Sequence, residues 1–184
     1  MLARTLMTVA DRNDEKRLIR AAASGDEQAL RSLYDTHCHR AYALALRLTR
    51  SEADAEEAVQ DAFLRAFRAL GGFRAEARFS TWFFRIVVNR CHDLLARRQK
   101  QRQRETDLDE QLLPSRDHGQ DPLAAPRLQA ALEQLPVGYR EVLLLHDMLG
   151  LDHREIARTL GIRRGTSKSQ LHKARARMRE IMSQ

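Results

Sequence analysis

The sequence of 184 residues has few of the residues that interrupt helices or cross-link small folds. Its two cysteines, Cys38 and Cys91, are too few for a disulfide framework, which fits a reducing compartment. All four prolines lie between residues 114 and 136, and proline costs a helix interior about 3 kcal/mol, so the chain before them can form long helices. Aromatic residues make up only 5%, so we expect a core of Leu, Ala, Val and Ile.

Long apolar runs are also missing. No stretch approaches the roughly 20 apolar residues that span a bilayer. The first 17 residues lack the apolar core of a signal peptide. We therefore expect a soluble, cytoplasmic protein that is not inserted in a membrane.

The motifs of common catalytic and metal sites are absent as well. There is no glycine-rich phosphate loop, no HExxH and no Ser/His/Asp order, so we predict a protein that is not an enzyme and needs no cofactor. The stretches 37–39 (His-Cys-His) and 91–92 (Cys-His) invite a zinc interpretation. Neighbouring residues on a helix point about 100° apart and cannot readily share one ion. We predict no metal site, two half-buried cysteines and histidines at the surface.

Positive charge is in excess. The chain carries 32 Lys and Arg against 25 Asp and Glu, which gives a net charge of +7 and a pI near 10.1. Such a balance suggests a polyanionic partner but says nothing about the fold. The charge is concentrated near the C-terminus, where seven Lys or Arg and no acid lie between Arg163 and Arg179.

Apolar residues recur at helical spacing in two blocks. In the first block, Ser51 is suited to cap one helix and Gly71-Gly72 to end it, and Ser80-Thr81 is suited to cap the next. Residues 105–121 then hold six acids and one base with little to bury, which is typical of a linker. Fully extended, a linker of about 24 residues reaches about 80 Å, more than two DNA turns of about 34 Å.

The sequence thus predicts an all-α protein with two small helical domains joined by a flexible acidic linker. The predicted boundaries are 1–13 for an N-terminal extension, 14–98 for the first domain, 99–122 for the linker and 123–184 for the second domain.

The second block contains the pattern of a helix-turn-helix between His153 and Arg175. Gly161 stands where the turn needs a positive φ, which glycine adopts without strain. A new helix starts near Thr166, where backbone N–H groups and the helix dipole favour a phosphate. Ser167 occupies a slot that usually holds a branched apolar residue, which predicts looser packing. On the DNA-facing side we expect Lys168, Ser169, His172 and Lys173, with Arg163 and Arg164 meeting phosphates.

The first block contains a segment rich in aromatic and basic residues. Four of the ten aromatic residues lie between Phe79 and Phe84, with arginines on both sides. Aromatic faces beside arginines suit unstacked bases. The simpler interpretation places Phe79, Phe83 and Phe84 in the core, and for most of them we expect it to hold. The corresponding simple interpretation of the second block is a helical hairpin with a solvated basic face.

Three motifs in order make the sequence recognisable. The segment FRAEARFSTWFFRIVVNRCHDLLARR (73–98) resembles the promoter-melting region of bacterial sigma factors of the extracytoplasmic-function (ECF) class. Residues 54–70 resemble the core-polymerase-binding helix of the same family. The segments LPVGYREVLLL (135–145) and GTSKSQLHKAR (165–175) resemble its region 4. The resemblance covers the chain from about Leu18 to Met182.

The resemblance implies that the first domain is sigma region 2, which binds core RNA polymerase, notably the clamp helices of the β′ subunit, with further contacts to the β subunit. The residues that match this role are Glu57, Gln60 and Asp61. Taken alone, these polar residues would be a solvated helix face. On the family match, Asp61→Arg is expected to abolish polymerase binding and leave the fold intact.

The same domain would capture the non-template strand of the −10 promoter element. The family match puts Ala69, Phe73, Ile86 and Asn89 around a flipped-out base, and Trp82 at the melted junction. An Asn suits such a pocket because its amide offers both donors and an acceptor to a base edge. An Asn bonded to loop backbone is the alternative.

Region 4 would read the −35 element as duplex through the helix-turn-helix residues named above. The protein would then be an alternative sigma factor that directs promoter-specific transcription initiation. The expected partners are core polymerase, promoter DNA and an anti-sigma factor, with the protein a monomer when free or in a 1:1 complex with that factor. The alternative is a stand-alone helix-turn-helix regulator, which leaves the aromatic segment and residues 57–61 without a role.

Overall fold

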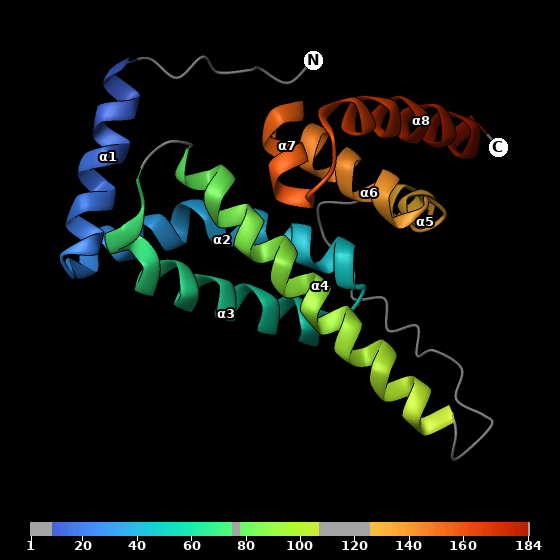
Figure 1. Cartoon of the computed structure of the whole chain (residues 1–184), viewed down its shortest axis with the longest axis horizontal. Helices are drawn as coiled ribbons and strands as arrows, with labels where there is room; N and C mark the ends of the chain where they lie inside the picture. Colours follow the sequence, from blue (N-terminus) through green and yellow to red (C-terminus); the bar gives the residue numbers. More distant parts are fainter. Residues whose placement is uncertain (1–8, 75–77, 107–125, 184) are drawn as a thin grey trace.

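The computed structural model describes residues 9–74, 78–106 and 126–183, and every regular element in these ranges is a helix. Two helical domains are visible in Figure 1, which confirms the predicted all-α architecture for this part of the chain. The first domain comprises α1 (Val9–Ala23), α2 (Glu27–Thr49), α3 (Glu52–Ala69), the 3-10 turn η1 (Leu70–Gly72) and α4 (Phe79–Thr106). The second comprises α5 (Pro126–Glu133), α6 (Val137–Leu143), the π-helical η2 (Leu144–Met148), α7 (His153–Leu160) and α8 (Arg164–Ser183). Within the described ranges, no helix is long and apolar enough to cross a membrane.

The starts of α2 and α3 follow from short polar signals. Gly25 has a φ of +92°, a conformation that glycine adopts without strain, and it turns the chain after α1. Asp26 then caps α2, because its carboxylate accepts a hydrogen bond from the Ala29 N–H at 2.8 Å. The Ser51 hydroxyl caps α3 by accepting from the Asp54 N–H at 3.3 Å, as predicted.

Aromatic rings fill the centre of the first domain. Phe79, Phe83 and Phe84 are each at most 2% exposed. Phe79 and Phe83 stack with ring centroids 5.8 Å apart, and Phe63 of α3 lies 4.4 Å from Phe83. The prediction that these three phenylalanines belong to the core is confirmed. They therefore do not offer their faces to bases.

Several predicted boundaries differ from the structure. α4 begins at Phe79, so Ser80-Thr81 lies inside the helix and does not cap it. It continues to Thr106, so residues 99–106 of the predicted linker are helical. This segment lacks proline and glycine and is rich in Lys, Arg and Gln, which favour helix. α1 likewise starts inside the predicted extension 1–13. The remainder of the predicted linker, and with it the predicted flexibility, lies outside the described residues.

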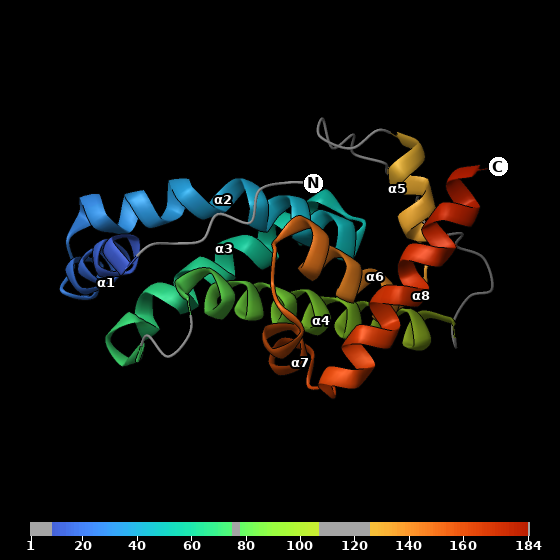
Figure 2. The ribbon, with the colours of Figure 1, turned by 90° about the horizontal axis from the view of Figure 1, so that it is seen from above.

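The two domains lie against each other. Figures 1 and 2 both show α7 beside the N-terminal half of α4, and the two helices are in contact. We call this packing of the two domains the closed arrangement. Its polar contacts are Thr81 Oγ1 to Glu155 Oε1 at 2.7 Å, His92 Nε2 to Glu141 Oε1 at 2.6 Å, and the Arg50 guanidinium to the Glu133 carbonyl oxygen at 2.9 Å.

Candidate nucleic-acid interface

The outer side of α8 and the turn before it carry the predicted duplex-binding residues. All seven are exposed, and we refer to them as the α8 surface: Arg163, Arg164, Thr166, Lys168, Ser169, His172 and Lys173. Ser167, Leu171 and Ala174 point the other way and are buried. This alternation is what a helix needs in order to pack on one side and enter a groove on the other.

Capping and one glycine place α8 relative to α7. The Asp152 carboxylate caps α7, and the Glu155 carboxylate accepts from the Asp152 N–H at 2.8 Å, which completes a capping box. Gly161 ends α7 with a φ of 66°, as predicted from the sequence. The turn is closed by the Ile162 N–H, which donates to the Ala157 carbonyl oxygen at 3.1 Å. The two helices therefore hold a defined angle.

Ser167 is more tightly packed than the sequence suggested. It is 0% exposed, and its Oγ lies 3.0 Å from Nδ1 of His153 on α7. Burial first, and then the positive charge of neighbouring His146, lowers the pKa of His153. A neutral His153 can accept the proton of the Ser167 hydroxyl. The predicted looseness is therefore replaced by a polar contact between α7 and α8.

Only part of the positive charge on α8 is committed to ion pairs. Arg175 pairs with Asp147 of η2, and Arg177 pairs with Glu180 at 3.0 Å. None of the four cations of the α8 surface has a carboxylate within 4.0 Å among the described residues. Their charge therefore remains available for phosphates.

Trp82, Ile86 and Asn89 lie on one stripe of α4, because they are four and three residues apart. We call these three residues the α4 stripe. Trp82 and Ile86 are half-buried, and Asn89 is exposed. Phe73, which follows η1, packs on this stripe with its ring centroid 5.0 Å from that of Trp82. The structure thus brings Phe73 to the stripe, whereas Ala69 lies exposed at the end of α3.

The polymerase-facing residues predicted on α3 form an exposed face. Glu57 and Gln60 are exposed, and Asp61 is half-buried. Sequence reasoning missed Leu64, which is seven residues after Glu57 and 48% exposed. The signal that could have found it is a large apolar residue at i+7 on a stripe that is otherwise polar. We call Glu57, Gln60, Asp61 and Leu64 the α3 face.

Asp61 also has an internal role. Its carboxylate forms an ion pair with Arg90 of α4, whose side chain is 7% exposed. Arg90 pairs in addition with Asp93 at 2.8 Å, and Asp61 with Arg65 at 3.1 Å. Removing the partner of a buried charge is costly. The expectation that Asp61→Arg leaves the fold intact therefore does not fit the structure.

Of the histidines and cysteines at 37–39 and 91–92, three pack within the first domain: His37, Cys38 and Cys91. His39 is exposed, and His92 contacts Glu141 of the second domain. His37 lies against Phe79, with ring centroids 5.3 Å apart, and burial followed by the charge of Arg40 lowers its pKa to about 4. Cys38 is half-buried as predicted, but Cys91 is fully buried, and burial raises the pKa of its thiol to about 12. The described residues include no group of three or more His, Cys, Asp or Glu able to hold a metal ion.

Two family models match the chain. Sigma-70 region 2 matches residues 33–101, and Sigma-70 region 4 matches residues 126–178. The ECF RNA polymerase sigma factor SigM of Mycobacterium tuberculosis is 37% identical over 172 residues, which cover 94% of this chain and 86% of SigM. The ECF RNA polymerase sigma-E factor of Escherichia coli is 29% identical over 171 residues, which cover 86% of this chain and 88% of that factor. The chain belongs to the ECF sigma factors, and it is an alternative sigma factor that directs transcription.

Solved structures agree with this assignment. CnrH, solved in complex with the cytosolic domain of CnrY, matches with a TM-score of 0.68 and 27% identity, over 92% of this chain and 97% of CnrH. RpoE of Bartonella quintana, solved with the anti-sigma factor NepR, matches with a TM-score of 0.65 over 96% of this chain and 98% of that one. Its identity of 20% supports the fold alone.

Proposed function

We propose that this sigma factor binds core polymerase through the α3 face, captures the −10 strand at Phe73 and the α4 stripe, and reads the −35 duplex with the α8 surface. The observation that carries the proposal is that the members of the α8 surface are all exposed on a helix whose opposite side is buried. The polymerase would catalyse RNA synthesis, so we propose that this protein is not an enzyme. It would act in the cytoplasm, as other sigma factors do.

The −10 assignment rests on the chemistry of the α4 stripe. Phe73 and Trp82 offer half-buried aromatic rings, and Asn89 offers an exposed amide. Rings of this kind stack on unpaired bases, and an amide can hydrogen-bond a base edge. Stacking on a ring needs a base that has left the duplex stack, so the stripe suits a strand that is already melted or is melting.

The closed arrangement must change when both promoter elements are bound. The Thr81–Glu155 hydrogen bond holds α7 against the first turn of α4, so both proposed DNA-binding surfaces belong to one packed body. Duplex DNA advances about 34 Å per turn, and the 19 residues between α4 and α5 are long enough to reach about 65 Å if fully extended. We therefore propose that the domains separate on the promoter.

The partner that keeps such a factor inactive is proposed from a relative. CnrH was solved with the cytosolic domain of another protein, CnrY. A protein of the anti-sigma type would bind this chain in the same way, as a 1:1 complex. Purification of the protein from its source cells tests this proposal, which expects a single partner at equal stoichiometry. Recovery of the protein only alone or with polymerase would contradict the proposed 1:1 complex.

The polymerase assignment is tested with core enzyme and a charge-reversed α3 face. Glu57→Arg with Gln60→Arg alters two exposed residues, so the fold is retained while binding to core polymerase falls by at least about tenfold, from loss of two contacts worth about 1 kcal/mol each. The control is Glu27→Arg, an exposed acid on α2. Run-off transcription and binding to core are both measured. Equal activity of the double variant and the control contradicts the assignment.

The duplex assignment is tested with the α8 surface. Arg163→Glu with Arg164→Glu removes the two exposed cations assigned to phosphates, which reduces the slope of log affinity against log salt by about 1.8, or about 0.9 per contact. The control is Arg177→Glu on the same helix, whose charge is already paired with Glu180. Holoenzyme binding to −35 duplex is measured at several salt concentrations. Identical slopes for both variants would show that the α8 surface does not bind the −35 duplex.

A further inference from the structure

Two histidine rings meet where the π-helical segment η2 packs on the helix-turn-helix. The ring centroids of His146, on η2, and His153, on α7, are 5.2 Å apart. Nδ1 of His153 lies 3.0 Å from Oγ of Ser167 on α8. Nδ1 of His146 lies 2.8 Å from Oδ1 of Asp147, which also pairs with Arg175 of α8. We call these five residues the histidine cluster, and the function proposed above gives neither ring a role.

The backbone around η2 brings the two rings together. The N–H of Leu149 donates to the carbonyl oxygen of Leu144 at 3.2 Å, which is the five-residue spacing of a π-helix. Single π-helical turns are rare and are found mostly at functional sites. Gly150, with a φ of +72°, then turns the chain, and His153 becomes the first residue of α7. The contact between the rings of His146 and His153 is therefore built by the main chain and does not depend on one side-chain rotamer.

Positive groups surround His153. Those that face it come from η2 and α8: His146, Lys168 and Arg164. Burial of the ring and then these three charges lower the pKa of His153, and Asp152 of its own helix acts in the other direction. On the side of α4, α7 is met by Thr81, which does not titrate. His153 is thus uncharged at neutral pH when no DNA is bound.

A bound phosphate would change this balance of charge. Arg164 and Lys168 belong to the α8 surface and lie in the first turns of α8, on either side of Ser167 in the sequence. Negative charge brought there by DNA favours the protonated form of the nearby imidazole. The contact with Ser167 survives protonation, because the neutral Nδ1 accepts from the hydroxyl and the protonated Nδ1 donates to its oxygen. A proton would therefore add charge beside the DNA without loosening α7 from α8.

We propose that His153 takes up one proton when the α8 surface binds the −35 duplex, so that promoter binding strengthens under mildly acidic conditions. The inference rests on the proposed function, because it needs phosphates at the α8 surface. The proton comes from solvent and enters at Nδ1, and the complex gains one positive charge. Since DNA raises the pKa of His153, the gain in affinity is complete below the pKa of the free protein and is absent above that of the complex.

The test follows duplex affinity against pH in three full-length proteins assembled with core polymerase. All three carry His172→Gln, because His172 is another histidine of the α8 surface. One has no further change, the second adds His153→Gln, and the control adds His39→Gln at an exposed position of α2. The probe is a labelled duplex with the −35 element of a promoter that the holoenzyme transcribes, at constant ionic strength.

The parent and the control should bind about fivefold more tightly at pH 5.5 than at pH 8, the size expected for one charge contact near the surface. The His153→Gln protein should lose this increase, although glutamine can still hydrogen-bond Ser167. Calorimetry of duplex binding in two buffers that differ in ionisation enthalpy should show uptake of up to one proton per complex by the parent. The same pH profile and proton uptake in all three proteins would overturn the proposal.

Two further variants distinguish charge from a purely structural role of the ring. His153→Arg keeps a positive charge at every pH, so it should bind at pH 8 about as tightly as the parent binds at pH 5.5. His146→Gln removes a charge that lowers the pKa of His153, so its affinity profile should move to higher pH. If both variants follow the parent at every pH, protonation of His153 does not contribute to binding. Thermal unfolding at each pH confirms that all variants are folded during the measurement.

The Arg163→Glu, Arg164→Glu double variant separates failure of this coupling from failure of the proposed function. If that variant binds the −35 duplex as tightly as wild type, the α8 surface is misassigned and the coupling to His153 falls with it. If that variant loses binding while His153→Gln keeps the acid response of the parent, the coupling alone is wrong. The expected result is weaker binding by the double variant and a flat pH profile for His153→Gln.

Discussion

The two domains present the residues proposed to bind DNA or polymerase in different ways. The α8 surface consists of exposed side chains, and the helix is anchored through separate residues such as Leu171 and Ala174. In the first domain the same groups serve both purposes, because Asp61 neutralises buried Arg90, and Phe73 packs on Trp82. Substitutions should therefore separate binding from stability in the second domain and couple them in the first.

Asp61→Arg gives the largest expected effect. It leaves buried Arg90 facing a second positive charge and should reduce the free energy of unfolding by about 3 kcal/mol, the lower end for loss of a buried ion pair, since Asp61 is itself partly exposed. Urea denaturation measures this. The control Glu57→Arg, on the same face of α3 but exposed, should stay within about 0.5 kcal/mol. Equal stability of the two variants would show that the Asp61–Arg90 pair carries no net stabilisation. Binding and stability would then not be coupled at Asp61.

The second prediction concerns His37, which is half-buried against the aromatic core of the first domain. Its pKa of about 4 lies below the ordinary 6.5, so the unfolded chain takes up a proton at a higher pH than the folded chain. Its contribution to stability is complete above pH 6.5 and is lost as the pH falls toward 4, by about 2 kcal/mol. His37→Leu should remove that part of the pH dependence, and His39→Leu, at an exposed position of the same helix, should not. Parallel pH profiles of stability for all three proteins would contradict the burial of His37.

Two serines of α8 test whether stability and DNA binding depend on different sides of one helix. Ser167→Ala deprives His153 Nδ1 of its partner and should reduce the free energy of unfolding by about 1 kcal/mol. Ser169→Ala, on the exposed side, should change stability by less than about 0.5 kcal/mol. Binding of the −35 duplex should show the opposite order, with Ser169→Ala more affected. Stability and DNA affinity that fall together in one variant would mean that the two sides of α8 are not independent.

The sequence was sufficient for features that depend on local pattern. The helix-turn-helix followed from the Gly161 turn and the spacing of apolar residues, and the structure has both. The core position of Phe79, Phe83 and Phe84 also followed, because a helix with large residues on its inner side has to bury them. The Ser51 cap is a third case, since it needs only a side chain and the next turn of its own helix.

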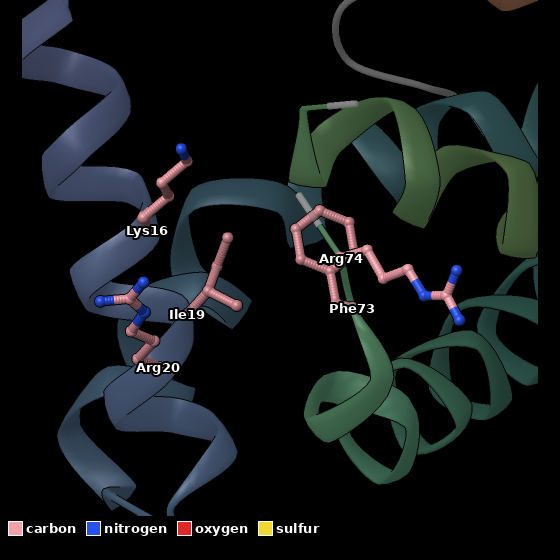
Figure 3. Close-up of a pocket in the computed structure, with 5 residues that line it drawn as sticks. All are labelled: Lys16, Ile19, Arg20, Phe73 and Arg74. Atoms are coloured by element: carbon pink, nitrogen blue, oxygen red, sulfur yellow. The ribbon is translucent and has the colours of Figure 1, made fainter. Parts of the chain in front are cut away.

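Features that depend on contacts between distant segments were not predictable. The Asp61–Arg90 pair joins residues 29 positions apart in sequence, and nothing in either helix marks one acid among several as internal. Ser167 appears as a packing defect until His153 is placed opposite it. The pocket between Ile19 of α1 and Phe73 (Figure 3) likewise requires both segments to be placed. The family match supplied functional positions but not these second roles.

The smallest expected effect lies where the two domains meet. The hydrogen bond between His92 and Glu141 raises the pKa of His92, although burial opposes it, and the charges of Glu141 and Asp93 add to the rise. A raised pKa means that the contribution is complete below the ordinary value of 6.5 and is lost as the pH rises through the folded-state pKa. The side chain of His92 is 43% exposed, so solvent screening limits the coupling to about 0.5 kcal/mol.

A double-mutant cycle measures this contact without the other effects of each substitution. His92→Gln and Glu141→Gln, alone and together, should show coupling at pH 6 and almost none at pH 9. The equivalent cycle for Thr81 and Glu155, the contact between α4 and α7, should give the same coupling at both values, because a threonine hydroxyl does not titrate. If the His92 cycle is equally strong at both values, the contact with Glu141 does not depend on protonation of His92. A coupling lost at high pH would mean that alkaline conditions favour separation of the two domains.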